Sequence, residues 1–119
     1  MTVLGIDPGL ERLGYALVEA NGNKMVPLSY GLISTQKTDN HSIRLMQIFL
    51  DLKQIITEKR PDYLSVETLI FAKNVKTATL ISEVRGVILL SGALCDIPIV
   101  EYTPLSVKMA VTGYGRSDK

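Results

Sequence analysis

Two periodicities alternate along the chain, and their order is the feature that most restricts the fold. Short aliphatic and β-branched runs predict strands, whereas longer stretches with apolar residues three and four positions apart predict helices. The expected elements are strands at Val3–Ile6, Gly14–Glu19 and Val26–Ser34, a helix at His41–Lys59, a strand at Tyr63–Glu67, a helix at Val75–Leu94, a strand at Ile97–Glu101 and a short helix at Pro104–Val111. This order predicts an α/β fold with a mixed sheet flanked by helices, beginning with an antiparallel meander.

Turn and cap residues agree with this order. Asn21-Gly22-Asn23 is typical of a tight hairpin turn. Pro27 favours an edge position for its strand, because proline has no amide to donate. The second helix is apolar over much of its circumference, so we expect it to face both the sheet and a second subunit.

Composition excludes several classes of protein. A chain of 119 residues with 46% apolar residues suits one domain spanning residues 1–119. Cys95 is the single cysteine and His41 the single histidine, which leaves no basis for a disulfide framework, a zinc cluster or serine-histidine-acid catalysis. No apolar run reaches the length of a membrane span and no secretion signal is recognisable, so we expect a cytoplasmic protein with no membrane partner.

Two of the predicted strands run into an acidic residue, Asp7 for the first and Glu67 for the fourth. Ligands of open α/β sheets gather at the carboxyl ends of strands, so Asp7 and Glu67 could meet there. Mg²⁺ takes oxygen ligands and needs only one or two carboxylates from the protein. The alternative from spacing alone is that both acids are turn and cap residues.

Several segments resemble those of one enzyme family. They are, in order, Leu4–Gly9, Gly14–Ala16, Pro61–Glu67, Phe71–Asn74, Arg85–Val87, Glu101–Pro104, and Val107-Lys108 with Gly113 and Gly115. In order and spacing the whole chain resembles the RuvC family of bacterial Holliday-junction resolvases. The resemblance implies a ribonuclease H-like mixed sheet and a Mg²⁺-dependent endonuclease. It also implies symmetric nicking of four-way junction DNA during recombination and repair.

The resemblance further implies roles for individual residues of the nuclease site. Asp7 and Glu67 become metal ligands in a site that holds two Mg²⁺ ions in the complete enzyme. Lys108 and Lys119 become catalytic-site cations that approach DNA phosphates near the cut. The alternative for both lysines is an ordinary solvated side chain.

A loop after Glu67 is similar to the one with which family members contact bases at the junction centre. Ile70 or Phe71 could insert as the wedge, and a core role for both side chains is the alternative. Three further candidate DNA contacts are Lys73, Asn74 and Lys76, of which Asn74 could instead cap the following helix. Arg85 could bind DNA or form an intrahelical or intersubunit ion pair.

RuvC-like resolvases carry further catalytic acids on a C-terminal helix, which this sequence lacks, so we expect residues 1–119 alone to cut DNA poorly. The implied partners are junction DNA, a second copy of the chain and the RuvA-RuvB branch-migration complex. Rival hypotheses are another ribonuclease H-like nuclease, a non-catalytic junction-binding module, and an ATP-binding protein of the sugar-kinase and actin class. The last of these is disfavoured because the chain is too short for two lobes.

Overall fold

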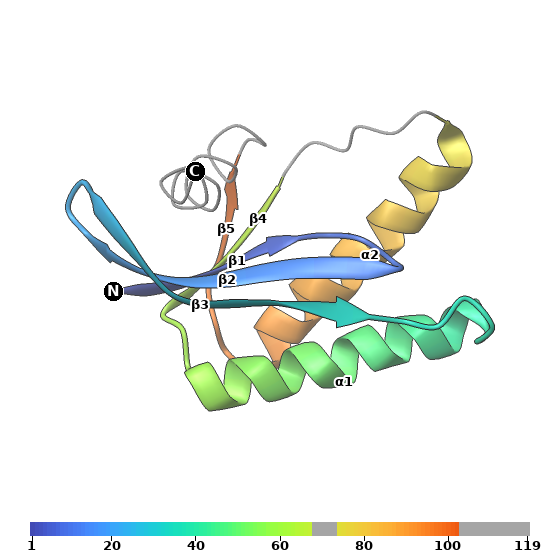
Figure 1. The fold of residues 1–119 in the computed structure, drawn as a ribbon, viewed down its shortest axis with the longest axis horizontal. Helices are drawn as coiled ribbons and strands as arrows, with labels where there is room; N and C mark the ends of the chain where they lie inside the picture. Colours follow the sequence, from blue (N-terminus) through green and yellow to red (C-terminus); the bar gives the residue numbers. More distant parts are fainter. Residues whose placement is uncertain (68–73, 103–119) are drawn as a thin grey trace.

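The computed structural model describes residues 1–67 and 74–102. A five-stranded mixed sheet forms its centre, with the strand order β3-β2-β1-β4-β5 (Figure 1). The strands are β1 (Thr2–Asp7), β2 (Arg12–Asn21), β3 (Lys24–Ser34), β4 (Tyr63–Glu67) and β5 (Ile99–Tyr102). β1, β2 and β3 form the antiparallel meander, and β4 and β5 continue the sheet in parallel with β1. Consequently β1 has one antiparallel and one parallel neighbour.

Both helices pack against one face of the sheet. α1 (His41–Lys59) buries Ile48, Leu52 and Ile56, which recur every four residues along one side of the helix. α2 (Val75–Leu94) connects β4 to β5 and buries Val84 and Ile88. These side chains join a single core cluster with residues of four strands, namely Leu4, Ile6, Leu13, Leu17, Ile33, Leu64 and Val66.

Helix α2 lies close to the sheet at Gly92. A Cβ atom at this position would lie 2.7 Å from Leu64 Cδ1 and 2.9 Å from Ile99 Cδ1. Contacts this short do not occur between real side-chain carbon atoms, so the Leu64 and Ile99 side chains would have to move to admit a larger residue. Glycine at this position therefore allows Leu64 and Ile99 to pack directly against the backbone of α2.

The observed elements confirm the predicted order, with shifts at their ends. The hairpin turn falls at Gly22, which has a φ of +60°, and β3 is an edge strand, as Pro27 indicated. The last strand begins at Ile99 and not at Ile97, because the Ile97 amide donates to the Gly92 carbonyl at 2.9 Å and thereby belongs to the end of α2. The expected helix at Pro104–Val111 lies outside the described residues.

No apolar segment was expected to reach the length of a membrane span, but α2 does. α2 has twenty residues and a mean hydropathy of 1.4, so by length and composition alone it could cross a membrane. One side of the helix packs against the sheet, where Val84 and Ile88 are fully buried, whereas Leu90 and Leu94 are exposed. Two charged residues near its middle, Glu83 and Arg85, contact His41 and Glu101 respectively.

Replacing Gly92 with alanine is expected to lower the free energy of unfolding by about 1 kcal/mol. Overpacking costs roughly 1–3 kcal/mol, and this outweighs the gain of about 1 kcal/mol from alanine in a helix. The variant Ile99→Val removes one of the crowded methyl groups, so Gly92→Ala should cost less in that background. Urea denaturation of both single variants and the double variant measures the coupling, and strictly additive effects would contradict the close contact.

Candidate functional site

Asp7 and Glu67 end neighbouring strands at the same register position. β1 and β4 run parallel, and Ile6 pairs with Val66, so Asp7 and Glu67 are the next residue on each strand. The fold thus brings two acids that are sixty positions apart to one edge of the sheet. This edge lies at the carboxyl ends of parallel strands, where ligands of α/β sheets gather.

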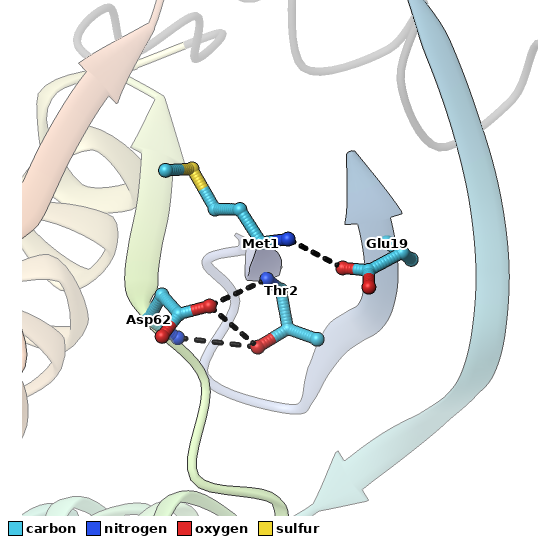
Figure 2. Close-up of polar contacts among 4 residues, drawn as sticks. All are labelled: Met1, Thr2, Glu19 and Asp62. Carbon is cyan, nitrogen blue, oxygen red and sulfur yellow. Dashed lines mark hydrogen bonds and ion pairs between the residues drawn. The ribbon is translucent and has the colours of Figure 1, made fainter. Parts of the chain in front are cut away.

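Thr2 and Asp62 fix this register at the opposite ends of both strands (Figure 2). The Thr2 amide donates to Asp62 Oδ2 at 2.8 Å, and the Asp62 amide donates to the Thr2 carbonyl at 2.9 Å. The Thr2 hydroxyl lies 3.3 Å from the same carboxylate oxygen. A slip of one residue would place Asp7 opposite a residue that points to the other face, so these bonds help to hold the acids in line.

Asp7 lies on the sheet face turned away from the helices. Leu4 and Ile6 are fully buried on the helix side, and alternate residues of a strand point to opposite faces. Asp7 itself is exposed. The chain then turns tightly at Gly9, where a Cβ atom would lie 2.1 Å from the Arg12 carbonyl oxygen. The carboxylate therefore stands at an accessible edge just before a close turn.

Thr35 links that turn to the end of β3 and to α1. Its hydroxyl donates to the Leu10 carbonyl at 2.5 Å, and its amide donates to the Glu11 carbonyl at 3.1 Å. Arg44 of α1 donates from Nε to the same hydroxyl at 2.9 Å. Because Thr35 is only 8% exposed, water competes little for these bonds. The backbone after Asp7 is consequently held by two other elements.

A third acid near this edge is already paired. Glu101 of β5 lies opposite Val66 of β4, one position before Glu67 in the register. Its carboxylate forms an ion pair with Arg85 of α2, whose side chain is mostly buried. Arg85 was a candidate DNA contact, with an intrahelical or intersubunit pair as the alternative, and the observed pair joins helix and strand within one chain.

Oxygen donors at this edge suit a hard divalent cation. Asp7 and Glu67 are both carboxylates, and Mg²⁺ is commonly held by one or two carboxylates together with water and substrate oxygens. Among residues 1–67 and 74–102, no three His, Cys, Asp or Glu side chains converge into a larger metal-binding group. The residue types at the ends of β1 and β4 therefore fit Mg²⁺, since both are carboxylic acids and neither carries the sulfur or imidazole that zinc prefers.

The other predicted contacts lie partly outside the described chain. Asn74 is the N-cap of α2, where its side chain accepts a hydrogen bond from the Thr77 amide at 2.9 Å. Lys76 is exposed in the first turn of the same helix. The candidates outside the described residues are Ile70, Phe71, Lys73, Lys108 and Lys119.

A pocket of about 460 Å³ lies elsewhere, between the C-terminal ends of α1 and α2. It is lined by Lys53, Ile56, Thr57, Arg60, Leu94, Cys95 and Ile97. α1 leads directly into the start of β4, so this pocket is at the end of the sheet opposite Glu67. It plays no part in the site at Asp7.

Sequence reasoning missed the residues that hold the two acids in place. Neither Asp62 nor Thr35 was predicted to have a structural role of its own. Their partners are distant in sequence: Thr2 lies sixty positions from Asp62, and Leu10 lies twenty-five positions from Thr35. No local pattern predicts such bonds. The only local signal is that Asp62 directly precedes a strand, where its carboxylate can accept a hydrogen bond from the first amide of the neighbouring strand.

Comparison with protein families gives one match along almost the whole chain. The family model described as crossover junction endodeoxyribonuclease RuvC matches residues 3–119. A curated RuvC of Halothermothrix orenii is 50% identical over 119 residues, which are all of this chain and 72% of that protein. The RuvC of Alkaliphilus oremlandii is likewise 50% identical and is covered to 73%.

Solved structures show the same arrangement of elements. A Thermus thermophilus RuvC in complex with Holliday junction substrate is 25% identical, with a TM-score of 0.82 over 96% of this chain and 73% of that one. The yeast mitochondrial Holliday junction resolvase Ydc2 is 15% identical, with a TM-score of 0.66 over 94% of this chain and 54% of that one, a likeness of fold alone. These likenesses confirm the ribonuclease H-like α/β fold.

The contacts of Asp62 lead to a stability prediction. Asp62→Ala removes two hydrogen bonds to Thr2, and we expect the free energy of unfolding to fall by roughly 1–2 kcal/mol. Asp39→Ala is the matched control, because Asp39 is an exposed aspartate in the turn before α1. Urea denaturation of both variants measures the difference, and equal losses would show that the contact with Thr2 does not stabilise the register.

Proposed function

The chain belongs to the RuvC family of crossover junction endodeoxyribonucleases, and we propose that it resolves four-way DNA junctions by Mg²⁺-dependent hydrolysis at Asp7 and Glu67. The observation that carries this proposal is the shared register of the two acids on β1 and β4. The likeness to a RuvC solved with Holliday junction substrate supports the choice of DNA substrate.

Hydrolysis of a phosphodiester joins a water oxygen to phosphorus, breaks one phosphorus–sugar oxygen bond and transfers a proton to the leaving oxygen. We propose that Asp7 and Glu67 hold the metal, which supplies positive charge against the developing negative charge on the phosphate. In this proposal Lys108 and Lys119 bind neighbouring phosphate oxygens and add to that neutralisation. Two ions per complete site are expected from the family resemblance.

The segment between β4 and α2 is the proposed base-contacting loop. Ile70 or Phe71 would insert between bases at the junction centre, and Lys73 would bind the backbone. Asn74 uses its side-chain oxygen to cap α2, which leaves its NH₂ group as a donor for a phosphate. Lys76, exposed one turn away, extends the same cationic surface.

We further propose that two copies pair through α2, because resolution requires nicks on two opposed strands and a twofold dimer supplies two identical sites. Leu90 and Leu94 are 53% and 60% exposed, four residues apart on one side of the helix. Apolar side chains at this spacing are typical of a contact between helices. A cytoplasmic setting and association with RuvA-RuvB follow from the resemblance.

Junction cleavage tests the proposed function. We expect residues 1–119 alone to nick a labelled four-way junction poorly in Mg²⁺, because the resemblance implies further acids on a C-terminal helix. A form extended with the C-terminal residues of the Halothermothrix orenii relative should nick symmetrically, and Asp7→Asn in that form should lower the rate at least about 100-fold.

Three outcomes separate the alternatives. Symmetric nicking that disappears in the Asp7→Asn variant supports the resolvase. Binding without nicking in every form indicates a non-catalytic junction-binding module. Robust cleavage by residues 1–119 alone would show that the acids of this segment suffice for catalysis. Preference for another nucleic acid over the junction would indicate a different nuclease of the same fold.

Assembly through α2 has its own test. Leu90→Glu places a charge on the proposed interface, and we expect it to convert a dimer into a monomer in analytical ultracentrifugation. Leu50→Glu is the matched control, because Leu50 is a similarly exposed leucine, at 49%, on the other helix. A monomeric unmodified chain, or equal effects of the two substitutions, would rule out the α2 interface.

A further inference from the structure

Arg12 lies on the same sheet face and at the same edge as Asp7. It is the first residue of β2 and precedes Gly14, the register partner of Asp7, by two positions. Leu13 between them is fully buried on the helix side. Since alternate residues of a strand share a face, Arg12 and Gly14 both lie on the face of Asp7. Two residues of strand correspond to about 7 Å, which places Arg12 just beyond the end of β1.

Arg12 differs from the neighbouring Glu11 in having no ion-pair partner among the residues that the structure describes. Glu11 forms an ion pair with Lys37, with 3.4 Å between Oε1 and Nζ. The side chain of Arg12 is exposed, and within residues 1–67 and 74–102 no acidic group pairs with it. The guanidinium therefore remains available for an external anion beside the proposed metal-binding acids.

The backbone that carries Arg12 is already fixed. The carbonyls of both preceding residues, Leu10 and Glu11, accept hydrogen bonds from Thr35. Arg44 donates to the Thr35 hydroxyl, and Arg12 itself pairs with Ser34 in the β2–β3 ladder. A cation on a fixed backbone loses less conformational freedom when it binds a ligand than one on a loose loop.

We infer that Arg12 binds a backbone phosphate of the DNA strand whose scissile phosphate lies at Asp7 and Glu67, an inference that rests on the proposed function. A guanidinium binds phosphate oxygens through two parallel hydrogen bonds, which gives direction as well as charge. The two residues of β2 between Gly14 and Arg12 span about 7 Å. This length corresponds to roughly one to two nucleotides of DNA, since successive phosphates of one DNA strand rise by about 3.4 Å. Arg12 thus positions the backbone of the DNA strand where it passes the β1–β2 turn.

The salt dependence of junction binding tests this role. Binding of a labelled four-way junction is measured by fluorescence anisotropy in EDTA, at several salt concentrations, for the unmodified chain and for Arg12→Gln, Arg12→Lys and Lys24→Gln. Lys24 is an exposed cation at the hairpin end of the sheet, so Lys24→Gln removes the same charge far from Asp7. All variants should unfold at the same urea concentration as the unmodified chain.

We expect Arg12→Gln to bind roughly tenfold more weakly and to lower the slope of log K against log salt by about 0.9, the effect of one lost phosphate contact. Arg12→Lys should keep the slope, and Lys24→Gln should match the unmodified chain. Equal effects of Arg12→Gln and Lys24→Gln, including no effect of either, would overturn the inference while leaving the proposed function standing. No junction binding by the unmodified chain would overturn the proposed function and the inference together.

Discussion

The parallel pairing of β1 with β4 is the interaction on which the site depends. Each strand ends in one acid, and the two acids occupy neighbouring positions in the sheet only while the strands keep one register. Thr2 and Asp62 secure that register from the opposite end through side-chain and backbone hydrogen bonds. The placement of the proposed metal site therefore depends on a polar contact about five residues away along both strands.

The two faces of the sheet are used differently. One face is covered by α1 and α2 and supplies the continuous core, with Leu4, Ile6 and Val66 fully buried. The other face carries Asp7 and, along the edge strand β3, the exposed side chains of Tyr30 and Leu32. Asp7 is exposed at the end of its strand, so a charge there costs little desolvation, while the core cluster lies on the helix side.

The order of elements and the positions of Asp7 and Glu67 at the ends of their strands could be predicted from the sequence, because both follow from local periodicity. That the two acids share one metal site stays a prediction, which rests on the rule that ligands gather at the carboxyl ends of strands. The sequence did not predict that Arg85 pairs with Glu101 across helix and strand, since that pair depends on how closely α2 packs on the sheet. The close packing of Leu64 and Ile99 against Gly92 was not predicted either, because no local pattern marks this glycine. The roles of Lys108 and Phe71 stay predictions, because both residues lie outside the described chain.

The sixty positions between Thr2 and Asp62 also have a consequence for how the molecule folds. The meander of β1, β2 and β3 is built from contacts between neighbours in sequence, whereas β4 can join β1 only after a long loop containing α1 has closed. Loop closure of this length costs entropy before any β1–β4 hydrogen bond repays it, so the meander is expected to form early and the β1–β4 pairing late. During synthesis on the ribosome, the free edge of β1 is consequently an unpaired template for other strands until β4 has emerged.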